Sequence, residues 1–176
     1  MTRSPDQILV QRALEHDCGS LAQLCERYYP SLVAVARSVL LDVHLAEDAA
    51  QEALAEACSR LGKLRDPRSF GPWVGSICRN VAKDMLRARK RQRKATEAYA
   101  VREPGGCDGR AEQLSKAVEA LPPHLREVLF LRYHSEMTYR QMSSVLGLTQ
   151  QAINGRLRRA KRKLAAMMKS NGFLRE

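Results

Sequence analysis

The 176-residue sequence predicts an all-α protein made of two small helical domains joined by a flexible linker. Apolar residues recur at three- and four-residue spacing along most of the chain, which is typical of amphipathic helices. No alternating run bounded by turn signals indicates a β-strand. The stretch Glu103-Pro-Gly-Gly-Cys-Asp-Gly109 cannot hold a helix, so we expect domains over 5–94 and 111–170 with a linker over 95–110.

The first domain is predicted to begin with a helix over Pro5–Asp17. The apolar spacing continues over Leu21–Tyr29 and Leu32–Leu41. Pro30 has no backbone N–H, so we expect it to interrupt the helical pattern between them. The residues of the first helix that are expected to face inward are Ile8, Leu9, Ala13 and Leu14.

A helix over Ala46–Leu61 combines an apolar side with an acidic one. Positions 41–60 hold five acidic residues (Asp42, Glu47, Asp48, Glu52, Glu56) and one basic residue, Arg60, in a chain of net charge +11. An acidic surface repels DNA, so this side is expected to meet a protein, although a merely solvated face is the bland alternative. The inward stripe is Ala46, Ala49, Ala50, Ala53, Ala57 and Leu61. The outward face is Asp48, Gln51, Glu52, Ala55, Glu56 and Ser59.

A basic segment follows, made of a loop over Gly62–Ser69 and a long helix over Phe70–Lys94. Between Arg79 and Lys94 eight basic residues (Arg79, Lys83, Arg87, Arg89, Lys90, Arg91, Arg93, Lys94) accompany one acid, Asp84, which suits contacts to nucleic-acid phosphates. The inward side is Phe70, Trp73, Val74, Ile77, Val81 and Met85, with Trp73 interpreted as a core residue. The predicted DNA-binding residues are Lys63, Arg65 and Arg68 of the loop and Arg79, Asn80, Lys83, Arg87 and Lys90 of the helix.

The second domain carries a helix-turn-helix pattern within Leu121–Leu164. A short helix over Thr138–Leu146 is followed by Gly147, which suits the positive φ of a tight turn. Thr149 is a favourable N-cap for the next helix. That helix turns Ile153, Leu157, Ala160 and Leu164 inward. Its other side suits readout of base edges, and the predicted DNA-binding residues are Thr149, Gln150, Gln151, Asn154, Arg156, Arg158, Arg159 and Arg162.

Composition restricts the possible partners. The charge of +11 and a pI near 9.9 indicate a polyanionic partner, either nucleic acid or an anionic membrane surface. No apolar run reaches the length of a bilayer span, and the N-terminus lacks the layout of a signal peptide. We therefore expect a soluble, cytoplasmic protein.

Cysteines and histidines form no recognisable catalytic or metal pattern. The five cysteines contain no CxxC pair, and the four histidines are scattered singly. Four cysteines lie in helical patterns, where a free thiol acts as a small apolar group, whereas Cys107 lies in the glycine-rich stretch. The sequence predicts no metal site and no enzyme.

Two stretches, in this order, resemble the extracytoplasmic-function (ECF) sigma factors of bacterial RNA polymerase. Ala46-Glu-Asp-Ala-Ala-Gln-Glu-Ala-Leu54, with Phe70-Gly-Pro-Trp-Val74 after it, is similar to sigma region 2. Leu121-Pro-Pro-His-Leu-Arg-Glu-Val128, with Leu146-Gly-Leu-Thr149 and Arg156-Leu-Arg-Arg-Ala160 after it, is similar to sigma region 4. Both halves together make the resemblance specific.

The resemblance implies a division of labour along the chain. Asp48–Leu61 would bind the clamp helices of the polymerase β′ subunit, and the linker would thread into the core enzyme, which includes β. Leu61–Lys94 would melt the −10 promoter element and capture its non-template strand, while Tyr139–Arg158 would read the double-stranded −35 element. An anti-sigma factor is a further expected partner, held in an apolar seam between the domains. No cofactor is implied, since the polymerase performs all the chemistry.

The chain departs from the family pattern in the helix-turn-helix. Gln141-Met142-Ser143 stands where Glu-Ile-Ala is usual, and Ala152-Ile153 where Thr-Val is usual. Gly155 replaces a usual serine; it either lets the backbone approach DNA or is simply tolerated. Two other functions stay open at this point: a freestanding helix-turn-helix regulator and a nonspecific nucleic-acid packing protein.

Overall fold

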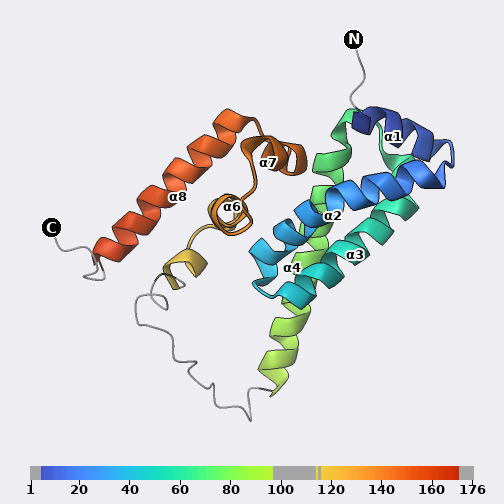
Figure 1. Ribbon diagram of the computed structural model, residues 1–176. Coiled ribbons are helices and arrows are strands. Elements are labelled where there is room, and N and C mark those ends of the chain that lie inside the picture. Colours follow the sequence, from blue (N-terminus) through green and yellow to red (C-terminus); the bar gives the residue numbers. More distant parts are fainter. Residues whose placement is uncertain (1–4, 97–113, 115, 171–176) are drawn as a thin grey trace.

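The computed structural model describes residues 5–96, 114 and 116–170, and this part of the chain is helical with no strand (Figure 1). The all-α prediction is therefore confirmed. The predicted linker over 95–110 begins later than expected, because the helix that starts at Phe70 continues through Thr96. The remainder of that linker, including Cys107, lies outside the described residues.

The N-terminal module is a bundle in which α2, α3 and α4 pack against one another and α1 packs on α2 (Figure 1). Two 3-10 turns, η1 and η2, connect α3 to α4. The elements are α1 (Pro5–Leu14), α2 (Cys18–Leu40), α3 (Val43–Arg60), η1 (Leu61–Lys63), η2 (Pro67–Ser69) and α4 (Phe70–Thr96).

The expected interruption at Pro30 is wrong, since α2 runs through this residue without a break. Pro30 is exposed, while Tyr28 and Leu32 on either side of it are buried in the core. A proline inside a helix costs about 3 kcal/mol, and burying one large apolar side chain recovers roughly 2 kcal/mol. Packing on both sides of Pro30 therefore keeps one helix continuous.

The first helix is shorter than predicted and is turned differently. It ends at Leu14, and His16 adopts a left-handed φ of 69°. Asp17 then caps α2 instead of ending α1, since its Oδ1 accepts a hydrogen bond from the backbone N–H of Gly19 at 2.9 Å. Leu9, Val10 and Ala13 are buried, whereas Ile8 and Leu14 are exposed, so the inward side lies about one residue from the predicted one.

The alanine stripe of α3 is buried as predicted. Ala46, Ala49, Ala50 and Ala53 have no exposed surface, and Ala57 and Leu61 are also buried. Methyl side chains let helix backbones approach closely, so α3 packs tightly on both α2 and α4. The α3 helix starts at Val43 because the carboxylate of Asp42 accepts the N–H of Leu45 at 3.2 Å.

The second module contains α6 (Pro123–Leu129), a π-turn η3 (Phe130–His134), α7 (Tyr139–Leu146) and α8 (Gln150–Ser170). The hydroxyl of Thr138 accepts a hydrogen bond from the backbone N–H of Gln141, and Oε1 of Gln141 accepts one from the backbone N–H of Thr138. These two hydrogen bonds form a capping box at the start of α7. Gly147 ends α7 with φ of 67°, as the turn prediction requires.

The two modules pack directly against each other through α7 and α4 (Figure 1). A Cβ added to Gly71 would lie 2.3 Å from the carbonyl oxygen of Ser144, and one added to Gly75 would lie 2.3 Å from that of Val145. The backbones therefore approach closely only because both positions are glycine. The expected seam between separated domains is closed where α4 meets α7, and a pocket of about 180 Å³ lined by Tyr28, Phe70 and Ser144, among others, lies beside this contact.

Candidate nucleic-acid and protein interfaces

The α8 helix presents polar and basic side chains on the side that faces away from the core. Its start is fixed by Thr149, whose Oγ1 accepts the N–H of Ala152 at 3.1 Å, so the predicted N-cap is confirmed. The inner side is held by Ile153, Leu157 and Ala160, which are at most 3% exposed. The predicted DNA-binding residues that are exposed on and before α8 are Thr149, Gln150, Gln151, Asn154, Arg158, Arg159 and Arg162.

Arg156 differs from these residues, because its side chain is half-buried. Arg159 is partly engaged within the helix, where its Nε donates to the carbonyl oxygen of Gly155 at 3.3 Å. A Cβ added to Gly155 would meet nothing within 4 Å, so this glycine serves no packing contact inside the protein. The outer side of α8 thus exposes amide and guanidinium groups, which suits a helix that binds in the major groove of DNA.

A second basic surface follows the outer side of α4. Asn80, Lys83, Arg87 and Lys90 are exposed there, in the order that the sequence predicts. Arg87 also pairs with Asp84 at 2.8 Å, a contact between largely exposed groups that phosphate oxygens can displace. These residues form a strip of positive charge along one helix, which suits backbone contacts to a nucleic acid.

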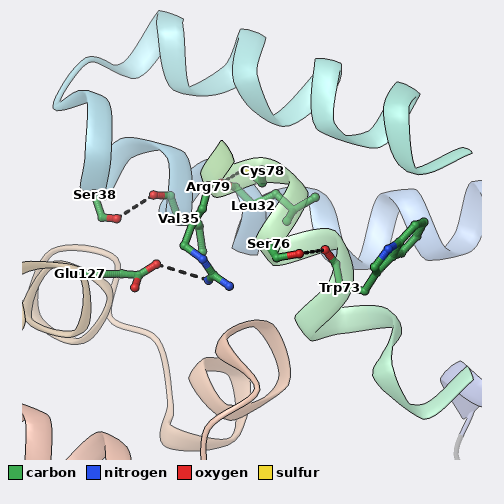
Figure 2. Close-up of polar contacts among 8 residues, drawn as sticks. All are labelled: Leu32, Val35, Ser38, Trp73, Ser76, Cys78, Arg79 and Glu127. Carbon is green, nitrogen blue, oxygen red and sulfur yellow. Dashed lines mark hydrogen bonds and ion pairs between the residues drawn. The ribbon is translucent and has the colours of Figure 1, made fainter. Parts of the chain in front are cut away.

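Arg79 belongs to the predicted strip by sequence but is turned toward the other module. Its guanidinium Nη1 lies 3.4 Å from Oε1 of Glu127 on α6, and Figure 2 shows the two side chains facing each other. Nearby, Arg37 of α2 lies 5.9 Å from the ring centre of Phe130. In this arrangement Arg79 therefore takes part in the contact between the modules.

The loop between α3 and α4 adds three exposed cations to the N-terminal end of this surface. Lys63, Arg65 and Arg68 are all exposed. The loop is ordered by Asp66, whose carboxylate accepts the N–H of Arg68 at 2.9 Å and caps η2. Pro67 starts that turn, because its fixed φ suits the first position of a helix.

The acidic surface lies on the side of α3 opposite its alanine stripe. Asp48, Gln51, Glu52, Ala55 and Ser59 are exposed, as predicted. Glu56 is half-buried and pairs with Arg60 one turn later, which lowers its availability to a partner. The surface therefore offers the two exposed carboxylates of Asp48 and Glu52, with amide, methyl and hydroxyl groups beside them, to a basic partner surface.

The core near these surfaces contains buried groups that the sequence patterns do not reveal. The Cys78 thiol donates to the carbonyl oxygen of Leu32 at 3.3 Å, and burial raises the pKa of this thiol to about 12 (Figure 2). Burial also raises the pKa of Tyr28 to about 12, and Asp6, to which its hydroxyl donates at 2.9 Å, raises this pKa further. Trp73 is half-buried with its ring 6.0 Å from that of Phe70, as its core interpretation requires.

Contacts between the modules were missed by sequence reasoning. The Tyr28 hydroxyl lies 3.3 Å from Oγ of Ser144, and Glu127 reaches Arg79 from a helix that carries no other signal of docking. One local signal was present: Gly71 and Gly75 are four residues apart, so they lie on one side of α4 and mark a place of close approach.

Neither a metal site nor a membrane span occurs in the part of the chain that the structure describes. No group of three or more His, Cys, Asp or Glu side chains is placed to hold an ion in residues 5–96 and 116–170. Across the same residues, no helix has the length and apolar character needed to cross a bilayer.

Two regions of the chain match models of known protein families. Residues 24–92 match Sigma-70 region 2, and residues 111–164 match Sigma-70, region 4. Together the two matches span more than half of the chain, in the order of the two modules. The chain belongs to the sigma-70 family. The matches coincide with the module that bears the acidic and basic surfaces and with the helix-turn-helix module.

Relatives and one solved structure support the ECF branch of this family. The chain is 34% identical over 168 residues to the "Probable RNA polymerase sigma factor RfaY" of Xanthomonas campestris pv. campestris, covering 84% of this chain but 42% of that relative's length. It is 25% identical to the ECF RNA polymerase sigma factor SigM of Bacillus subtilis, over 84% of this chain and 94% of that relative's length. The structure of CnrH in complex with the cytosolic domain of CnrY aligns with this chain at a TM-score of 0.62 and 26% identity. The alignment covers 94% of this chain and 97% of CnrH.

Proposed function

We propose that this protein is an ECF sigma factor that binds core RNA polymerase and directs it to promoters with particular −10 and −35 elements. The observation that carries the proposal is the separation of charge by helix. The exposed side of α3 bears Asp48 and Glu52, whereas α4 and α8 expose cations and amides. One surface thus suits a protein and two suit DNA.

In this proposal each surface has one partner. The acidic side of α3 docks on the clamp helices of the polymerase β′ subunit. The loop of Lys63, Arg65 and Arg68, with Asn80 and the α4 strip, holds the melted non-template strand of the −10 element through phosphate contacts and stacking. The exposed side of α8 lies in the major groove of the −35 element, where Asn154 and Arg158 contact base edges.

The promoter geometry requires the two modules to separate. The −10 and −35 elements are about 25 base pairs apart, which is roughly 85 Å of B-form DNA. A contact between α4 and α7 cannot be kept while both elements are bound. The packed arrangement is therefore the form of the free protein, and docking on polymerase exchanges contacts between modules for contacts with the enzyme.

The polymerase supplies every catalytic group, so this chain acts as a non-enzymatic specificity subunit without a cofactor. It works in the cytoplasm, where polymerase and chromosome meet. Because the similar sigma factor RpoE was solved in complex with the anti-sigma factor NepR from Bartonella quintana, an anti-sigma factor is proposed as a further partner, to be sought by pull-down from lysate and mass spectrometry.

Charge reversal on α3 tests the proposal against a freestanding helix-turn-helix regulator. The double variant Asp48→Lys with Glu52→Lys is expected to lose co-purification with core polymerase and run-off transcription, while its affinity for duplex DNA stays the same or rises. The matched control reverses Glu15, which is exposed in the turn between α1 and α2, and Glu26, which is exposed on α2. Unchanged binding of core by the α3 variant would contradict the proposal.

Promoter selectivity is the second arm of the test. Run-off transcription with core polymerase on a panel of promoters is expected to give product from a few of them only. Equal product from all templates, or the same DNA affinity for every sequence, is the result that a nonspecific packing protein gives. Such an outcome would exclude sequence-directed initiation.

A further inference from the structure

The α2–α3 hairpin places two thiols in contact. Cys25 lies 15 residues before Leu40, the last residue of α2, and Cys58 lies 15 residues after Val43, the first residue of α3. Since both helices rise about 1.5 Å per residue from the same turn, the two positions stand at the same level of the hairpin. Their Sγ atoms are 4.0 Å apart.

Solvent reaches this pair from one side. A pocket of about 260 Å³ between the start of α2 and the end of α3 is lined by Cys58, together with Cys18, Leu21 and Leu61. Cys25 is half-buried and does not line this pocket. The space holds several water-sized molecules, so a small oxidant can reach the Cys58 thiol directly.

We propose that Cys25 and Cys58 form an oxidisable dithiol, in which a hydroperoxide such as H₂O₂ first attacks Cys58 and Cys25 then completes an intramolecular disulfide. This differs from the interpretation of both residues as small apolar groups. Disulfides in reducing compartments are usually transient and redox-sensing, so the bond is a reversible modification rather than a structural element. The contact between the two thiols does not depend on the proposed function, whereas the reversibility of the bond rests on the cytoplasmic location proposed above.

Disulfide formation takes two steps, oxidation of Cys58 to a sulfenic acid and attack by Cys25. The sulfur of Cys58 attacks one peroxide oxygen, the O–O bond breaks, and the leaving hydroxide takes the thiol proton to give water and a sulfenic acid. The sulfur of Cys25 then attacks the Cys58 sulfur, the S–O bond breaks, and the departing hydroxide takes the Cys25 proton as a second water. Two thiols lose two electrons in total, and one H₂O₂ is reduced to two H₂O.

The surroundings of the thiols support this order. Burial, with the adjacent Cys58 sulfur, raises the pKa of Cys25 to about 11, so Cys25 stays protonated and is a poor first target for peroxide. The second step is favoured by proximity, because the sulfurs need to move from 4.0 Å to a bond of about 2.05 Å. The exposed Cys18 is a separate thiol, whose Sγ lies 3.8 Å from the carbonyl oxygen of His16.

Peptide mapping of the full chain tests the proposal. Trypsin leaves Cys18 and Cys25 in one peptide, because no Lys or Arg lies between Arg12 and Arg27, so the protein is prepared as Cys18→Ser. After treatment with H₂O₂, free thiols are blocked with N-ethylmaleimide and the protein is digested without reduction. A peptide pair linked through Cys25 and Cys58, released by dithiothreitol, is expected.

Two outcomes would overturn the proposal: a bond that uses Cys107 or Cys78 in place of either partner, or Cys58 oxidised to sulfinic acid with Cys25 still free. The order of attack is tested with dimedone, which labels sulfenic acids. Cys25→Ser is expected to trap a dimedone adduct on Cys58, whereas Cys58→Ser is expected to leave Cys25 unlabelled. Labelling of Cys25 in the second variant would reverse the assignment. Circular dichroism establishes that both variants are folded.

Discussion

Arg79 on α4 and Glu127 on α6 form an ion pair between the two modules, with 3.4 Å between Nη1 and Oε1. Their side chains are 21% and 12% exposed, so the pair is screened from water more than the other ion pairs of the described residues. Arg79 is also a predicted contact of −10 DNA. In the proposed function Arg79 contacts a DNA phosphate. The carboxylate of Glu127 and the DNA phosphates therefore compete for Arg79.

Glu127→Gln is expected to strengthen binding of the free protein to single-stranded DNA. Loss of the carboxylate frees Arg79, and a gain of about 1 kcal/mol corresponds to an affinity about fivefold higher. Fluorescence anisotropy with a labelled oligonucleotide at fixed salt measures it. Glu136→Gln removes the same charge from an exposed turn of the same module and serves as the control. Equal gains in both variants would mean that net charge, not Arg79, is responsible.

Gly75→Ala is expected to separate the modules without unfolding them. The new Cβ would lie 2.3 Å from the carbonyl oxygen of Val145 on α7, while alanine itself favours helix in α4 by about 1 kcal/mol. Small-angle scattering should therefore show a radius of gyration several ångströms larger, against about 16 Å for a compact chain of 176 residues. Unchanged scattering with unchanged helicity would show that the contact tolerates a methyl group.

Local patterns predicted most of the helices and the inward sides of α3 and α8, since these depend on neighbours three and four residues away. The alanine stripe of α3, the Thr149 cap and the left-handed Gly147 are such features. Pro30 was misjudged because tertiary packing outweighs one missing hydrogen bond.

The contact between the modules had no comparable pattern. It depends on pairs far apart in sequence, such as Tyr28 with Ser144 and Arg79 with Glu127, and each partner alone resembles an ordinary surface or core residue. Only the spacing of Gly71 and Gly75 pointed to a close approach, and it did not identify the approaching helix. Pairing of Cys25 with Cys58 likewise required the register of the hairpin.

Gly155→Ala is expected to stabilise the second module and to leave DNA binding unchanged. The position lies inside α8, where alanine is favoured over glycine by about 1 kcal/mol, and the added Cβ meets no atom within 4 Å. Urea denaturation measures the gain, and a −35 duplex measures binding. A lower affinity in the stabilised variant would show instead that DNA approaches the backbone at this glycine.

Stability is expected to fall in acid partly through two helix caps. The Leu45 backbone N–H, followed by the charge of Arg89, holds the pKa of Asp42 below its usual value, and Ser20 does the same for Asp17. A carboxyl with a lowered folded pKa contributes stability above its unfolded pKa, near 3.9, and loses it as the pH falls through the folded pKa.

The double variant Asp17→Asn with Asp42→Asn keeps the capping geometry but removes both titrations. Its urea midpoint is expected to change less than that of the parent between about pH 4 and pH 2.5. Parallel curves for the two proteins over that range would show that other carboxylates control acid unfolding.

Arg158→Ala is expected to weaken binding to the preferred −35 duplex by about 1–3 kcal/mol, the range for an arginine that contacts a guanine edge. Lys163→Ala, an exposed cation five residues and so roughly 140° further round α8, removes equal charge away from the predicted face. The comparison of preferred and scrambled duplexes decides the role of Arg158. A loss confined to the preferred sequence indicates base readout, because a phosphate contact weakens both duplexes alike. Equal losses would therefore reassign Arg158 from sequence recognition to backbone positioning, and Asn154 would become the next residue to test.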